Sequence, residues 1–343
     1  MGQFPYQKIR QRALFLMPVL LLILMGLDLG SVLYLPWFEN WFEPEMTGEK
    51  VDFLWKILIF NLQLPHVLAV VLVGSALGLS GGVLQSYLRN PLADPALIGL
   101  SSGGSLSTAC FLMLARLENW VVSLWGYVIS ALLGVFLVLF FLLRLAVFLD
   151  RLGIAGIILI GIGVNACLGA VLSCAMVFLD QSNLNQVLIW GLGSFQLPSY
   201  FLLVLSLGFW IVGSVGVYLI LDDLDKLNFG ERAAFSMGVN LQKLKIKVLI
   251  SVSCLMGVAV MLAGPMAFVG LLAPHFARYW TGPRARFLLL GSAICGAVWL
   301  LLADLLASFW IEGQLPVGIV CALLGGPFFI GLLIKMARRS RIC

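Results

Sequence analysis

The sequence predicts an all-α polytopic membrane protein with about ten transmembrane helices. Of its 343 residues, 62% are hydrophobic and only 11% are charged, whereas soluble domains carry roughly 25% charged residues. Continuous apolar runs such as residues 131–143 exclude a transmembrane barrel, because barrel strands alternate apolar and polar residues. Ten spans of about 20 residues each would leave only short loops, so we expect a single transmembrane domain over residues 1–343.

Breaks rich in charge, proline or glycine separate the ten expected spans. The first follows a basic leader, but its length of about 23 residues exceeds the roughly 7–15 apolar residues of a signal peptide, so we expect a retained helix. The second is long, with an irregular start at Pro65, and the eighth is too short to cross as a straight helix. Such helices are tolerated in a bilayer only beside protein or water, which favours a transporter or a channel. The expected spans are 13–35, 53–88, 96–115, 120–143, 154–179, 200–221, 248–263, 268–279, 287–309 and 317–336.

The placement of lysine and arginine predicts that both termini are cytoplasmic. If the N-terminus is inside, only Lys50, Lys56 and Arg116 of the 21 basic residues fall on outer segments, which leaves 18 inside. Cationic loops are retained on the cytoplasmic side. The net charge of +5 therefore reflects topology, and no nucleic-acid partner is expected. The acids expected on the outer side are Glu39, Glu43, Glu45, Glu49, Asp52, Glu118, Asp180 and Glu312.

No motif for enzymatic chemistry is present in the sequence. A phosphate-binding G-x-x-x-x-G-K-[ST] loop is absent, so we expect any ATP hydrolysis to take place on a partner. His66 and His275 have no metal-ligand or triad spacing, and the seven cysteines include no C-x-x-C pair. We therefore expect a protein that is not an enzyme and has no cofactor or metal.

Two acids lie inside expected spans. Buried membrane acids are candidate functional groups by default, so Asp28 and Asp304 are candidates for proton coupling. The alternative for Asp304, near the outer end of its helix, is that it simply bonds to backbone groups.

Small residues form two stripes. Gly74, Gly78 and Gly82 recur every fourth position, which predicts close helix packing. In the second stripe, Asn165 and Gly169 indicate either an interhelical hydrogen bond or a solvated path.

The longest inner loop, residues 222–247, carries nine charges in 26 residues. Gly230 and Gly238 bracket a segment that could form two helical turns lying along the membrane surface. Such a helix would either contact a partner or merely connect two spans.

Five segments carry a family resemblance. RNPLADPALIGLSSGG (89–104), LNFGERAAFSMGV (227–239), GPMAFVGLLAPHFAR (264–278), LLADLLA (301–307) and LPVGIVCALLGGPFF (315–329) resemble the permease subunits of type II ABC importers for vitamin B12, haem and iron siderophores. The resemblance runs from about Leu64 onward. It implies a bacterial inner-membrane permease that forms a homodimer or pairs with a paralogue, two ATP-binding subunits on the cytoplasmic side and a periplasmic substrate-binding protein.

The resemblance also implies roles for particular residues. The loop between spans six and seven would couple to the ATPase, and Asn165 and Gly169 would lie on the helix that lines the translocation path. Vitamin B12 permeases carry arginines that meet the binding protein at positions matching Gln63, His66 and Ser308, none of which is arginine here. The residues implied for ATPase coupling are Leu227, Gly230, Glu231, Ala234 and Gly238, and those for a structural loop or gate are Asn90, Pro91, Asp94, Pro95, Pro274, His275 and Arg278.

For the loop, the residue types give a local reason as well. Prolines stop one helix and start the next, and Asp94 can accept backbone N–H bonds as a cap.

Three functions are open at this stage. The first is the permease of an ABC importer for a bulky metal chelate, the second a secondary transporter coupled to protons through Asp28 and Asp304, and the third a channel. Which chelate is carried does not follow from the residues.

Overall fold

A computed structural model describes residues 17, 18, 20–28, 57–118, 120, 123–148, 153–179, 181–195, 199–309 and 315–340. Within these residues the regular structure is entirely helical, and seven helices are long and apolar enough to cross a membrane. A shorter apolar helix covers Leu100–Ala115. The number of ten spans and the cytoplasmic location of the termini stay predictions. The expected outer acids at 39, 43, 45, 49, 52, 180 and 312 lie outside the described residues.

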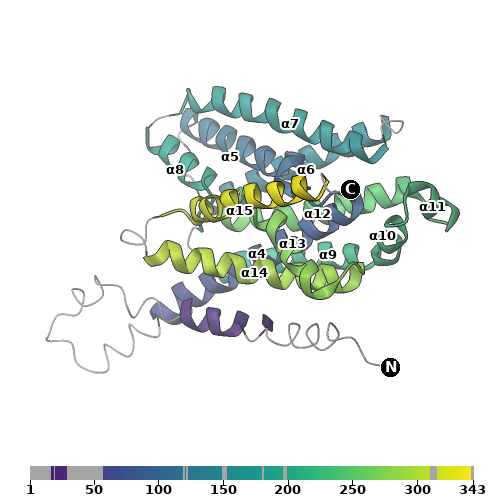
Figure 1. Ribbon diagram of the computed structural model, residues 1–343. Coiled ribbons are helices and arrows are strands. Elements are labelled where there is room, and N and C mark those ends of the chain that lie inside the picture. Colours follow the sequence, from purple (N-terminus) through teal and green to yellow (C-terminus); the bar gives the residue numbers. More distant parts are fainter. Residues whose placement is uncertain are drawn as a thin grey trace.

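The long helices run side by side across the view in Figure 1, with α10 and α11 together at one end of the bundle. An N-terminal helix at residues 17–28, whose residue 19 is not described, precedes the labelled elements. The labelled elements are η2 (Leu58–Gln63), α4 (Leu64–Leu88), η3 (Pro95–Ile98), α5 (Leu100–Leu117), α6 (Leu124–Phe148), α7 (Gly153–Met176), α8 (Gln181–Gly191), α9 (Tyr200–Tyr218), α10 (Leu221–Leu227), α11 (Glu231–Ser236), α12 (Leu241–Ala263), α13 (Val269–Thr281), α14 (Ala285–Phe309) and α15 (Val317–Ser340).

Several expected boundaries shift for local reasons. The irregular start of the second span is confirmed, because the π-helix η2 precedes α4 and Pro65 lies in the first turn of α4. The third begins as the 3-10 helix η3, and Gly99 at φ +85° separates it from α5. α12 starts at Leu241 rather than 248, because Asn240 Oδ1 accepts a hydrogen bond from Lys243 N at 2.9 Å and caps it. The polar helix α8 was not expected from hydropathy.

The glycine stripe on α4 packs directly on the backbone of α14. A Cβ atom added at Gly78 would lie 2.1 Å from Ser292 O, and one added at Gly296 would lie 2.1 Å from Gly74 O. A side chain at either position would therefore collide with backbone atoms that cannot move aside. The predicted close-packing role of the stripe is confirmed, and α4 and α14, two central helices of the fold, are in backbone contact along it.

Two apolar helices leave most of their surface open. In α7 the segment Leu159–Met176 is almost entirely unburied, and in α15 the segment Val317–Ile334 is mostly unburied. Exposed leucine and isoleucine side chains occur along both, including Leu159, Ile162, Leu323 and Ile330. These two helices offer apolar surface to lipid or to a further helix.

Candidate functional site: a surface at α11 and a polar cluster on α14

The segment α10–α11 folds because glycine stands at two positions of positive φ. Gly230, at φ +106°, precedes α11, and Gly238, at φ +85°, follows it, a backbone region that glycine adopts without steric cost. Between them, Ala234 is fully buried, and its N–H donates to Gly230 O at 2.8 Å. Leu227, also fully buried, anchors the end of α10. Glu231 is in the first turn of α11, where a carboxylate is favoured by the helix dipole.

Three apolar side chains project from this segment into solvent. Phe229 is 77% exposed, Phe235 71% and Met237 43%. Apolar groups this exposed on a segment rich in charge are typical of a surface that binds a partner. The sequence analysis did not single out the two phenylalanines, although two aromatic residues within a charged loop were a visible signal. We call Phe229, Phe235 and Met237 the α11 surface.

The α11 surface is attached to both central helices. Asp225 Oδ1 on α10 accepts a hydrogen bond from Ala285 N at 2.7 Å, at the first residue of α14. Arg89 follows α4, and its guanidinium lies beside Gly230, at 3.7 Å from the position that a Cβ would take. A displacement of α11 would thus act on the ends of α4 and α14.

The loop after α4 is held by its own polar side chains. Asn90 Oδ1 accepts from Leu92 N at 3.0 Å across the turn that contains Pro91. Asp94 caps η3 as predicted, because its Oδ1 accepts from Ala96 N at 3.0 Å. Pro95, the first residue of η3, packs on Gly270 of α13.

Asp94 also accepts a hydrogen bond from the backbone N–H of Phe268, just before α13. Burial raises the pKa of Asp94 to about 6, against the lowering effect of the two N–H bonds. The loop and the start of α13 are therefore fastened by one carboxyl group.

The short helix α13 contains the other predicted gate residues. Pro274 is buried inside it. The His275 ring lies edge-on to Tyr279 at 5.5 Å and to Phe328 of α15 at 6.0 Å between ring centroids. Arg278 Nη2 lies 3.5 Å from Gln85 Oε1 of α4, as a donor. Their roles as a gate stay predictions.

Asn165 and Gly169 lie on the open helix α7. The Ser102 hydroxyl on α5 donates a hydrogen bond to Asn165 Oδ1, so the interhelical bond, one of the two alternatives, is present. A Cβ added at Gly169 would meet nothing within 4 Å. Whether these residues line a path stays a prediction.

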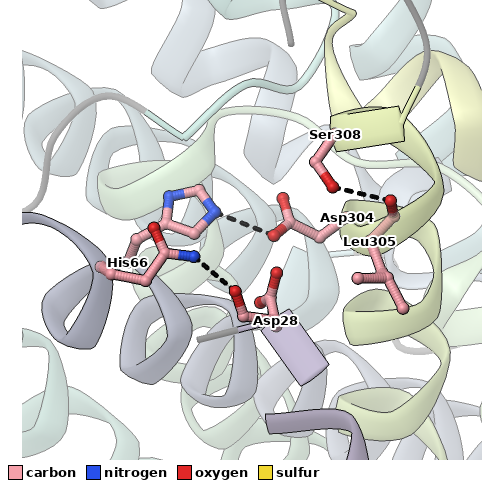
Figure 2. Close-up of polar contacts among 6 residues, drawn as sticks. Asp28, His66, Asp304, Leu305 and Ser308 are labelled. Carbon is pink, nitrogen blue, oxygen red and sulfur yellow. Dashed lines mark hydrogen bonds and ion pairs between the residues drawn. The ribbon is translucent and has the colours of Figure 1, made fainter. Parts of the chain in front are cut away.

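A polar cluster gathers side chains from three helices (Figure 2). His66 Nε2 on α4 lies 2.9 Å from Asp304 Oδ2 on α14, and the side chain of Asp28 from the N-terminal helix lies beside Asp304 (Figure 2). Gln63 Nε2 donates to Asp28 O at 2.7 Å. The sequence analysis named the two acids separately, and the structure brings them together with His66 of α4. We call Asp28, His66 and Asp304 the acidic cluster.

The cluster also accounts for positions that the resemblance assigned to docking. Gln63 and His66 are engaged by Asp28 and Asp304, and the Ser308 hydroxyl donates to Leu305 O of its own helix at 2.7 Å. Their hydrogen bonds thus run within the protein.

Comparison with known proteins finds similar permeases over most of the chain. The chain is 34% identical to the vitamin B12 import system permease protein BtuC of Vibrio cholerae over 91% of this chain and 93% of that one. It is 32% identical to the hemin transport system permease protein HmuU of Yersinia pestis over 92% and 94%. A solved structure described as an inward-facing conformation of a candidate metal-chelate type ABC transporter superposes with a TM-score of 0.77 at 27% identity, covering 96% of this chain and 99% of that one.

The family model of the FecCD transport family matches residues 16–335. That range includes both the α11 surface and the acidic cluster. The relatives named here are permeases of ABC transporters, which are transport subunits and not enzymes. The chain belongs to the FecCD transport family.

Proposed function

We propose that this chain is the membrane-spanning permease of a binding-protein-dependent ABC importer that carries a bulky metal chelate into the cytoplasm. ATP hydrolysis takes place on a separate subunit. The family match and the relatives for vitamin B12 and hemin support this assignment. An iron siderophore, haem or vitamin B12 is the substrate class, and the chain is a multi-pass protein of a bacterial inner membrane with cytoplasmic termini and ten spans.

The observation that carries the proposal is the α11 surface. Phe229 and Phe235 are far more exposed than a mere connector between two spans requires. They stand on a segment whose glycines fix its shape. In this segment Asp225 bonds to the first residue of α14, and Gly230 lies beside Arg89 at the end of α4. A partner that seats on these rings can move both central helices together. We assign Leu227, Gly230, Glu231, Ala234 and Gly238 to the support of this surface.

The open apolar surfaces of α7 and α15 support the next part of the proposal, which concerns the remaining partners. Two copies of the chain, or one copy and a paralogue, face each other across α7 and α15, with Asn165 and Gly169 toward the path. Two ATP-binding subunits seat on α11 from the cytoplasm. A periplasmic binding protein delivers the chelate at the end where α14 carries Asp304. Closure of the ATPase dimer displaces α11, and the two permeases tilt to change which side of the path is open.

Removing the two rings tests the proposal. The double variant Phe229→Ala, Phe235→Ala is compared with Phe141→Ala, a 50% exposed phenylalanine on the apolar helix α6. Burial of each ring in an interface contributes about 1–2 kcal/mol, so the double variant should bind the ATPase at least about 30-fold more weakly. Affinity for the purified ATPase is measured in nanodiscs, together with chelate uptake in proteoliposomes.

The control should retain wild-type affinity and uptake. Equal affinity of the double variant and the control would remove α11 as the docking site. Uphill uptake by the chain alone, without the ATPase, would instead support proton coupling. The acidic cluster is the one specific observation that favours proton coupling. However, Asp304 stands 19 residues after Ala285, about 28 Å along α14, so the cluster occupies one end of the bundle and provides no relay across it.

A further inference from the structure

The acidic cluster holds more negative charge than its single histidine can balance. As whole residues, Asp28 and Asp304 are 1% and 6% exposed. His66 supplies at most one positive charge, through the 2.9 Å contact with Asp304. Two ionised carboxylates beside one imidazolium would leave a net negative charge buried among helices, which is strongly disfavoured.

The closeness of the two carboxyl groups also favours a bound proton. An ionised carboxylate only accepts hydrogen bonds, so Asp28 and Asp304, which lie side by side (Figure 2), can hydrogen-bond to each other only when one of the two is protonated. Two carboxyl groups this close do not both ionise readily, because like charges oppose each other. The arrangement resembles other sites where two acids share a proton.

The described groups around the cluster include an aromatic ring, a thiol and an amide. The groups that face the cluster are the Phe195 ring, 5.4 Å from the His66 ring between centroids, the Cys321 thiol of α15 near Asp304, and the Gln63 amide, which donates to Asp28 O. Among the residues that the structure describes, no three acids, histidines or cysteines are arranged to hold a metal ion. A proton is therefore the ligand that this chemistry fits.

We propose that Asp28 and Asp304, with His66 beside them, form a proton-binding site that fastens the N-terminal helix to α4 and α14. With the proton bound, the carboxyl groups hydrogen-bond and the three helices are joined. When the proton leaves to solvent, two carboxylates face each other, and their repulsion separates the N-terminal helix from α14. The helix is thus attached at low pH and released as pH rises. This inference concerns the chain alone and does not rest on the proposed transport function.

Hydrogen exchange of residues 17–28 in the full-length chain, in nanodiscs, tests the proposal from about pH 5 to about pH 9, a range that brackets histidine and perturbed carboxyl groups. After correction for intrinsic exchange, protection in the wild type should fall at least about tenfold as pH rises. In Asp28→Asn, the amide donates to the Asp304 carboxylate without a shared proton, so protection should not depend on pH. Ser308→Ala is the matched control, because that hydroxyl bonds only its own helix, and it should behave as wild type.

His66→Gln separates the carboxyl proton from titration of the imidazole. Glutamine can still donate to Asp304 but does not titrate, so the pH dependence should persist in this variant. A second readout is the infrared C=O stretch of a protonated carboxyl group, which should be present in wild type at neutral pH and absent in both Asp28→Asn and Asp304→Asn.

Constant protection in the wild type would overturn the proposal. So would an unchanged pH dependence in Asp28→Asn, or loss of the dependence in His66→Gln alone. A variant that fails to fold is recognised by lost protection in α12. In that case the test is the wild-type infrared spectrum, and absence of the band of a protonated carboxyl group at neutral pH would overturn the proposal.

Discussion

A hydrogen bond to one carboxylate connects α10 to α14. Asp225 Oδ1 accepts from Ala285 N at 2.7 Å, and it sits at the N-terminus of α14, where negative charge is favoured. Removing an N-cap acid costs about 1 kcal/mol, and a hydrogen bond to a charged group contributes about 1.5–3 kcal/mol. Because Asp225 is only partly buried, we take about 1–2 kcal/mol for Asp225→Ala. The equilibrium between attached and detached α10 should then shift roughly 5- to 30-fold.

Hydrogen exchange of residues 221–240 in nanodiscs measures this shift. Asp225→Ala should exchange roughly 5- to 30-fold faster than wild type, and Asp225→Asn less so, since the amide oxygen can still accept from Ala285 N. Asp222→Ala, at an exposed acid on the same short helix, should match wild type. If Asp225→Ala exchanges no faster than Asp222→Ala, this carboxylate does not hold α10 in place, and the attachment of α11 to α14 must be explained otherwise.

Two further predictions concern the stability of the folded chain. Gly296→Leu should destabilise the chain by about 3 kcal/mol or more, because the added side chain meets Gly74 O and the α4 backbone cannot yield. Thermal unfolding in detergent measures this loss of stability. The control is Gly208→Leu, whose Cβ meets nothing within 4 Å, and it should unfold near the wild-type temperature. Burial raises the pKa of Asp94 from 3.8 to about 6 in the folded state, so its contribution to stability is greatest at acid pH and falls as pH rises from about 4 to about 7, on the order of 1–3 kcal/mol. Asp94→Asn keeps an acceptor without the charge and should remove that part of the pH dependence, and an unaltered stability profile in this variant would contradict the assignment.

Features encoded by local pattern were predictable from the sequence. Apolar runs gave the spans, because each bilayer-facing helix needs a continuous apolar stretch. The fourfold spacing of Gly74 and Gly78 indicated a close helix contact, and Asp94 followed by Pro95 indicated a capped start. In each case the signal lies within one or two helical turns, where residue type and backbone geometry are directly linked.

Features that depend on tertiary arrangement were not. Asp28, His66 and Asp304 are far apart in the chain, and no pattern along one helix tells which acid meets which histidine. The exposure of Phe229 depends on how α10 packs against its neighbours, which include α14 through the bond from Ala285 N to Asp225. The polar helix α8 lacks the apolar run by which the other helices were recognised.

The backbone contact between α4 and α14 also supplies an internal reference distance. Spin or fluorescent labels placed on the far faces of these two helices should report one fixed separation whatever the nucleotide, lipid or pH, since neither backbone can approach or slide without a clash at Gly78 or Gly296. Labels on α7 or α15 can then be referenced to that pair. Any change in their distances would measure movement of the outer helices themselves and not tumbling or distortion of the whole molecule.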